Sequence, residues 1–299
     1  MILFPSSKEE LGNQLREADV LIDEIDLSEL NQLIDHTPDD MTATVEAGMK
    51  LSDFQKAIRA GGQWLPIDPP NPEALSISEL ISTNASGPSR YGFGTIRDWL
   101  IGLRFFLSDG RSIFNGGRVV KNVAGFDLCK LMVGSRGTLG VITEAIFKLM
   151  PIAEENATFS SACESLEEAS GKIEAIWGSS MRPSVLDLVR EKGQLLIALG
   201  ISGSKPDVVA QMKSAENIGN FIPAKLDYES RLRRRMNKTM SVLPELLIPS
   251  LAKLGDVDFV SRAGNGIIYT EGESSPPIWN QVEKRVKAQF DPKGILTPL

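Results

Sequence analysis

The spacing of hydrophobic residues changes several times near the N-terminus, and each change predicts a new element. Residues 7–10 form a capping-box string, and the apolar residues that follow it to position 18 have helical spacing, so a helix is predicted there. The apolar cluster at 20–22 and the run at 42–47 predict strands. Between them, residues 27–34 fit a short helix or a turn.

Amphipathic and extended segments alternate as far as position 150. Residues 51–58 predict a helix that ends at Gly61-Gly62, and a short extended piece follows. Residues 99–114 predict a hairpin around a Ser-Asp-Gly turn. A short helix at 127–132 and an alternating strand at 141–147 complete this part of the chain.

The pattern changes after Pro151, and the polar run Glu154-Glu155-Asn156 marks a domain boundary. Strands covered by two helices indicate a small α+β domain beyond it. The elements predicted there are helices at 166–176 and 208–212, a hairpin of strands at 185–189 and 195–201, strands at 257–260 and 266–270, and a last helix at 279–290.

Composition indicates a soluble globular chain, with 42% hydrophobic and 24% charged residues among 299. The net charge of -7 argues against a nucleic acid as the main partner. Cys129 and Cys163 are too few for a disulfide framework and fit a reducing compartment. Neither a signal peptide nor a membrane-spanning apolar run is recognised, so a cytoplasmic location is expected.

The inventory of reactive residues excludes several classes of enzyme. His36 is the one histidine, which excludes a His/Cys zinc site, and no G-x-S-x-G elbow or P-loop occurs. We interpret His36 as a surface histidine ahead of Thr37-Pro38. The string at 92–97 lacks the third glycine of a dinucleotide fingerprint and does not open a helix after a strand.

Three segments are rich in glycine and small polar residues: 83–88, 116–127 and 134–142. Glycine lets a backbone approach a ligand closely and lets successive N–H groups converge on anionic oxygens. Tight turns alone also recruit glycine, so each segment taken singly fits a structural role. Three of them within one domain favour a shared ligand.

The order of these segments resembles the FAD-binding domain of the vanillyl-alcohol oxidase superfamily, which has the PCMH-type fold. Within it, the chain is most similar to the FAD-binding E-subunit family of bacterial glycolate oxidases. The strings that carry the resemblance are 83–87, 90–98, 120–128, 137–143 and the closing motif 290–296.

In that family the flavin lies between two α/β subdomains, and a cap domain covers its ring. The resemblance implies an α+β fold with a PCMH-type FAD-binding module of two α/β subdomains at 1–151, a small α+β cap domain at 152–275, and a C-terminal helix and tail at 276–299 that return to the module. It implies FAD as cofactor. On the isoalloxazine and ribityl side it implies Pro69, Thr83, Asn84, Ala85, Ser86 and Gly87, and along the ribose and adenine Gly137, Gly140, Val141 and Ile142.

The chain departs from the family where the FAD diphosphate is held. The family has a glycine-rich loop between its first strands, whereas no glycine occurs here between Gly12 and Gly48. Residues 76–80 replace a Gly-Gly pair and bring Glu79 toward a dianionic diphosphate. A charge-assisted N–H to phosphate hydrogen bond contributes about 1.5–3 kcal/mol. Losing three would weaken binding by roughly 3 to 4 decades, so weak or absent FAD binding is a hypothesis.

Catalytic residues for 2-hydroxy-acid oxidation are not assigned. Such a reaction needs a base near the substrate hydroxyl and a cation for its carboxylate, and the cap region 152–275 contains no histidine. The run Arg231–Arg235 with Lys238 is a candidate for the carboxylate. The charge pattern of this run favours the alternative, which is a helix surface that faces solvent or a partner.

The function expected from the resemblance is that of a FAD-binding oxidoreductase subunit. It would support or relay electrons in 2-hydroxy-acid oxidation, in a complex with a catalytic FAD subunit and an iron-sulfur subunit. The alternative is a non-catalytic structural subunit that keeps the fold without tight FAD binding. The flavoenzyme reading expects residues 83–87 and 137–142 to face one crevice, and without that crevice only shared ancestry of the scaffold would remain.

Overall fold

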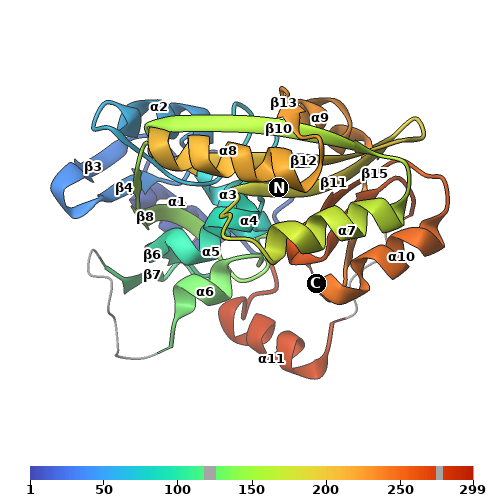
Figure 1. Cartoon of the computed structure of the whole chain (residues 1–299). Helices are drawn as coiled ribbons and strands as arrows, with labels where there is room; N and C mark the ends of the chain where they lie inside the picture. Colours follow the sequence, from blue (N-terminus) through green and yellow to red (C-terminus); the bar gives the residue numbers. More distant parts are fainter. Residues whose placement is uncertain (118–125, 274–278, 299) are drawn as a thin grey trace.

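Two β-sheets organise the chain in a computed structural model that describes residues 1–117, 126–273 and 279–298 (Figure 1). The first sheet is antiparallel between all neighbouring strands, because its strands follow one another through hairpins and returns. Its order is β3 (Leu33–Thr37), β4 (Thr42–Glu46), β8 (Val141–Lys148), β6 (Leu100–Phe106) and β7 (Ser112–Gly116).

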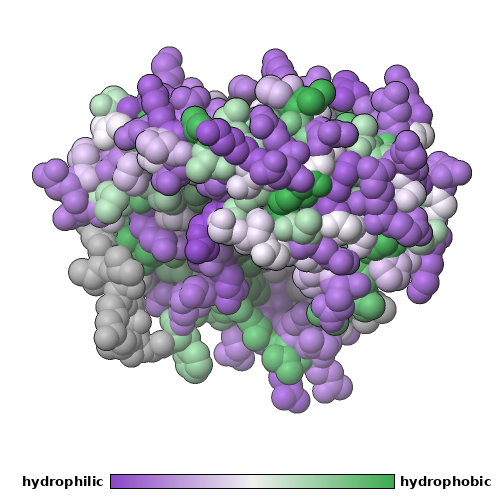
Figure 2. All heavy atoms as spheres, viewed as in Figure 1, coloured by the Kyte–Doolittle hydropathy of each residue, from purple (hydrophilic) through white to green (hydrophobic). Residues whose placement is uncertain are grey.

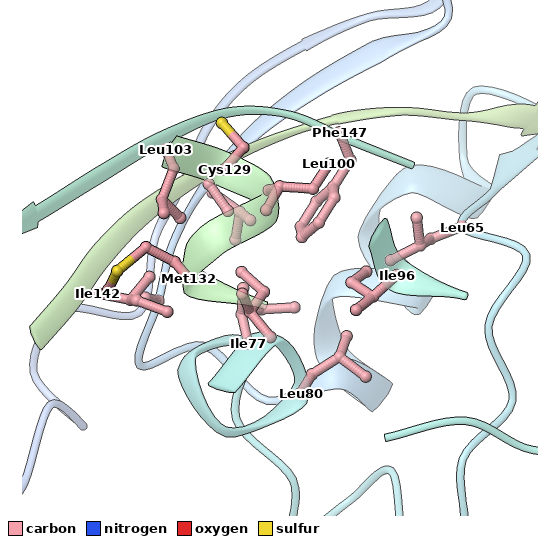
Figure 3. Packing of buried hydrophobic residues seen from close by; sticks show 14 of the residues in the cluster. Leu65, Ile77, Leu80, Ile96, Leu100, Leu103, Cys129, Met132, Ile142 and Phe147 are labelled. Atoms are coloured by element: carbon pink, nitrogen blue, oxygen red, sulfur yellow. The ribbon is translucent and has the colours of Figure 1, made fainter. Parts of the chain in front are cut away.

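Short helices cover this sheet and close its core. In α2 the residues Leu51, Phe54 and Ile58 are fully buried at helical spacing, and in α3 Ile77 and Leu80 point toward the sheet (Figure 3). Ser76 and Glu79 form a capping box that starts α3. The helices of this part are α2 (Leu51–Arg59), α3 (Ile77–Thr83), α4 (Arg90–Phe93), α5 (Ile96–Trp99) and α6 (Leu128–Met132).

The N-terminus forms a small separate layer. Strands β1 (Ile2–Leu3) and β2 (Glu24–Ile25) pair in parallel, joined through α1 (Lys8–Glu17), which Ser7 caps. Ile295 and Leu296 from the C-terminal tail are buried in the same hydrophobic cluster. The two ends of the chain therefore pack together, and a further two-stranded sheet joins β5 (Gln63–Trp64) to β9 (Met150–Pro151).

The second sheet has seven strands and helices on both faces. One face packs against α7 (Leu166–Trp177), α8 (Lys205–Gly219) and α10 (Leu247–Leu254), and the other against α9 (Tyr228–Arg231). The strand order is β13 (Ile222–Pro223), β10 (Glu155–Cys163), β12 (Gln194–Gly203), β11 (Val185–Glu191), β15 (Phe259–Arg262), β16 (Ile267–Thr270) and β14 (Lys238–Ser241). The 3-10 turns are η1 (Pro38–Asp40), η2 (Arg233–Arg235), η3 (Pro244–Leu246) and η4 (Ala263–Asn265), and α11 (Gln281–Phe290) is the last helix.

Most elements predicted by hydrophobic spacing are confirmed, and the exceptions are short or polar. The strand predicted at 20–22 is wrong, because the pairing residues are Glu24–Ile25. The helix or turn predicted at 27–34 is a turn that passes into β3 at Leu33. The polar run at 154–156 enters strand β10, and the predicted domain boundary at 151/152 lies just before it and stays a prediction.

The surface shown in Figure 2 is mostly hydrophilic, and the predicted surface histidine is partly buried. His36 is not a free surface histidine: it is half-buried in β3, with Nε2 2.9 Å from the Gln63 side-chain oxygen. On the face shown in Figure 2 hydrophilic residues predominate, and hydrophobic residues are scattered among them. Within the described ranges, no helix has the length and apolar character needed to cross a bilayer.

Candidate functional site

A cavity of about 170 Å³ lies between the N-terminal layer and the first sheet. All four residues predicted to lie along the ribose and adenine of the cofactor line this cavity: Gly137, Gly140, Val141 and Ile142. Ser78 and Ser82 from α3 form a second wall, and Leu296 and Thr297 from the tail a third. The remaining lining residues come from the segment between Gly12 and Gly48, which contains no glycine and which we call the glycine-free segment. They are Ile22, Asp23, Glu24, Ile25 and Leu27.

The two glycines of this cavity are explained by the protein's own packing. Gly137 has φ +77°, which a glycine adopts without strain, and a Cβ there would lie 3.2 Å from the Thr297 hydroxyl. A Cβ on Gly140 would lie 2.8 Å from the Phe106 carbonyl oxygen and 2.9 Å from the Phe105 ring. Glycine at these positions therefore lets the loop pack on β6 and the tail, whether or not a ligand binds.

The six residues predicted for the isoalloxazine side do not line this cavity. Thr83 and Asn84 end α3, with the Thr83 hydroxyl donating to the Glu79 carbonyl at 2.6 Å. Pro69 is buried, and Ser86 accepts a hydrogen bond from Arg90. The others, Ala85 and Gly87, pack against the core and the Asp68 backbone respectively.

The two predicted loops are nevertheless neighbours. The N–H of Gly134 donates to the Ile81 carbonyl at 3.0 Å, and the N–H of Arg136 donates to the Ser82 carbonyl at 2.8 Å. These amides are therefore already engaged at the end of α3. The middle of the intervening glycine-rich segment, residues 118–125, lies outside the described residues.

The glycine-free segment forms a tight turn held by its own hydrogen bonds. Asp26 accepts a hydrogen bond from the Ser28 N–H at 2.8 Å, and the Leu30 N–H donates to the Leu27 carbonyl. Asp23 forms an ion pair with the amino group of Met1. Glu79 does not line the cavity, because its carboxylate accepts hydrogen bonds from the Ser76 N–H and hydroxyl.

This arrangement fits an adenosine portion better than a whole FAD molecule. Asn84 Oδ1 and Ser135 Oγ are buried on the two loops without a hydrogen-bond partner in the described structure, and neither residue lines the cavity. However, drug-sized ligands occupy pockets of roughly 300–1,000 Å³, and this cavity is smaller. Asp23 and Glu24 on its wall also oppose a diphosphate. By its volume, the cavity would hold at most a part of the cofactor.

A second polar cluster lies where the two sheets meet. Arg262 and Asp187 are fully buried and ion-paired, Arg262 Nη2 lies 2.7 Å from a Glu229 oxygen, and the Tyr228 hydroxyl donates to Asp187 at 2.6 Å. Burial raises the pKa of Asp187 to about 6 and that of Tyr228 well above its usual value.

Asp68 belongs to the same electrostatic environment from the side of the first sheet. Its carboxylate accepts hydrogen bonds from the Ser89 N–H at 3.1 Å, and burial raises its pKa to about 6. One feature of the sequence points to this cluster: Asp187 interrupts an otherwise apolar strand.

The basic run is occupied by contacts within the chain. Arg231 pairs with Glu191 and Asp227, Arg233 stacks on the Tyr269 ring at 3.8 Å, and Arg234 donates to Asn71. Arg235 pairs with Asp258 and Glu271. The run lies on the short elements α9 and η2 and not on one helix surface.

Comparison with known proteins finds a family model and relatives that match part of this chain. Residues 4–114 match the FAD binding domain family. The glycolate oxidase subunit GlcD of Bacillus subtilis is 34% identical over 168 residues, 56% of this chain and 36% of that protein. The glycolate oxidase subunit GlcE of Escherichia coli is 36% identical over 143 residues, 47% of this chain and 40% of that protein.

A structural comparison extends the likeness to the whole chain. The structure of an alkyldihydroxyacetonephosphate synthase superposes with a TM-score of 0.75 and 20% sequence identity, over 100% of this chain and 76% of the other. The chain spans 36% and 40% of the lengths of GlcD and GlcE. The expected PCMH-type α+β fold is confirmed. Residues 4–114 thus match the FAD binding domain family, in a chain similar to the glycolate oxidase subunits over about half its length.

Proposed function

We propose that the chain is an accessory subunit in 2-hydroxy-acid oxidation, in a complex like that of glycolate oxidase. Its partners are a catalytic FAD subunit and an iron-sulfur subunit, and its location is the cytoplasm. The relationship to GlcD and GlcE supports this role. In this proposal the chain supports the catalytic subunit or relays electrons to or from it.

FAD binds weakly in this proposal, because the glycine-rich wall of the cavity suits the cofactor and the acidic wall repels its diphosphate. The observation that carries the proposal is that Gly137, Gly140 and Ile142 face Asp23 and Glu24 across one cavity. Bound FAD would supply a two-electron acceptor, which the protein's own side chains lack. The glycine side suits the adenosine, and the carboxylates weaken the hold on the diphosphate.

The alternative is a structural subunit that keeps the fold without the cofactor. Two observations favour it: the acidic wall of the cavity, and the engagement of Arg262 by Asp187 and Glu229. An arginine already neutralised by buried carboxylates does not readily bind the carboxylate of a substrate. On this alternative the chain contributes an interface and no redox chemistry.

The two functions are separated by the visible spectrum of the purified chain and by titration with FAD. A dissociation constant in the micromolar range supports the leading proposal, and no binding at about 100 μM, well above typical cofactor affinities, supports the structural alternative. Copurification with the catalytic subunit tests the complex itself. A submicromolar dissociation constant for FAD, measured without any partner, would overturn both the proposed weak binding and the structural alternative.

A further inference from the structure

Five large apolar side chains are exposed together at the N-terminal layer. They are Met1, Ile2, Phe4, Val20 and Leu21, with exposed fractions between 40% and 64%, and we call them the N-terminal patch. Backbone contacts make them neighbours, since the Met1 amino group donates to the Leu21 carbonyl at 3.3 Å. The Asp23 N–H in turn donates to the Met1 carbonyl at 2.9 Å.

Carboxylates surround the N-terminal patch. Ile2 lies beside Glu24 in the register of β1 and β2, and Asp23 pairs with the Met1 amino group. The sequence has no lysine or arginine between Arg16 and Lys50. The carboxylates of the adjoining segment are Glu17, Asp19, Asp23, Glu24, Asp26 and Glu29, of which all but Asp26 are exposed.

The two strands beneath the N-terminal patch form a sheet with free edges in the described chain. β1 and β2 form a two-stranded sheet, so each strand has one edge without a strand neighbour in the described chain. Unpaired strand edges template the addition of another strand. The exposed apolar patch beside these edges is the kind of surface that marks a protein interface.

We propose that the N-terminal patch is the docking surface for a different protein subunit, whose contact surface is apolar at its centre and rich in lysine and arginine at its rim. This inference rests on the proposed function for the identity of that subunit, the catalytic subunit of the complex. Charge complementarity decides the occupant. Two copies of this chain would bring two acidic rims together, and like charges across an interface oppose binding.

The test measures binding of the full chain to the full-length catalytic subunit from the same organism, at about 50 and 300 mM salt, where screening differs strongly. The wild-type chain should bind more tightly at low salt. Truncation of the centre in the double variant Val20→Ser/Leu21→Ser should weaken binding about tenfold or more at both salt concentrations. Reversal of the rim in Glu17→Lys/Asp19→Lys should weaken binding mainly at low salt.

Matched variants far from the N-terminal patch serve as controls. Val209→Ser/Ile222→Ser removes exposed apolar side chains, and Glu216→Lys reverses one exposed charge, both on the second sheet or its helix α8. Both controls should bind as the wild type does, and thermal unfolding of every variant confirms that it folds.

The outcomes separate this inference from the proposed function. Wild-type binding that neither patch variant changes overturns the docking surface and leaves the subunit role intact. Failure of the wild-type chain to bind the catalytic subunit overturns the subunit role and this inference with it. Self-association of the chain through the N-terminal patch, seen by sedimentation, would replace the heterologous partner with a second copy and overturn the proposal.

Discussion

Arg262 and Asp187 form an ion pair in which neither side chain is exposed to solvent. The pair lies near the contact between the two parts of the chain, since Arg262 interacts electrostatically with Asp68. At the same contact the Gly92 N–H donates to the Ser184 carbonyl at 3.1 Å, and the Tyr91 ring fills the space that a side chain on residue 264 would need. The buried charges therefore lie at the junction between the two sheets, where a change in one is expected to affect how the two parts pack.

Removal of one member of this pair should strongly destabilise the protein. Arg262→Met leaves the Asp187 carboxylate buried without its cation, and breaking a buried pair in this way costs about 3–5 kcal/mol. Urea unfolding measures the loss. Asp256→Asn is the matched control, because Asp256 pairs with Arg190 at the surface, and such pairs contribute about 0–1 kcal/mol. Similar losses in both variants would contradict the buried role of Arg262.

The stability of the protein should depend on pH through Asp68. Its pKa is raised from 3.8 to about 6 in the folded protein because burial disfavours the charged carboxylate. A raised folded pKa means that the folded state binds the proton more tightly, so this contribution is present at low pH and lost as the pH rises through 6. A shift of this size corresponds to at most about 3 kcal/mol.

Asp68→Asn provides the comparison for this pH dependence. An asparagine still accepts the hydrogen bond from the Ser89 N–H and has no proton to lose. Between pH 5 and pH 7.5 the free energy of unfolding should therefore fall less in the variant than in the wild type. Parallel curves for the two proteins would show that Asp68 does not titrate in this range.

Gly87 should resist substitution for a reason that involves no cofactor. A Cβ at this position would lie 1.8 Å from the Asp68 carbonyl oxygen, so Gly87→Ala forces the two backbones apart. Such overpacking costs about 1–3 kcal/mol. Gly171→Ala is the control, because nothing lies within 4 Å of its Cβ in helix α7 and alanine should stabilise the helix by about 0.5–1 kcal/mol. Thermal unfolding compares the two, and a neutral Gly87→Ala would refute the packing argument.

The sequence predicted the long periodic elements and missed features that depend on distant partners. Helix α7 and the hairpin of β11 and β12 follow directly from hydrophobic spacing. The polar start of strand β10 does not predict a strand, because its pairing with β12 and not its composition makes it one.

The candidate site shows the same division. The resemblance predicted that Gly137, Gly140, Val141 and Ile142 bind the cofactor. All four residues line one cavity in the structure. The resemblance did not predict that the tail residues Leu296 and Thr297 form another wall of the cavity, since they are far from this segment in the sequence. The junction pair of Asp187 and Arg262 is likewise 75 residues apart, so no local pattern joins them.

Removal of the negative charges on the acidic wall of the cavity should strengthen the binding of FAD. The double variant Asp23→Asn/Glu24→Gln removes two negative charges from the cavity wall and keeps the shape of both side chains. Two charges near a diphosphate are worth about 1–2 kcal/mol at the effective dielectric of a protein surface, so FAD should bind about tenfold more tightly. Quenching of flavin fluorescence during titration measures the affinity, and Glu216→Gln on α8 is the control with no expected effect. If the double variant binds FAD no better than the wild type, the limit on binding is the small volume of the cavity and the closed turn at residues 26–30, and the charges are not its cause.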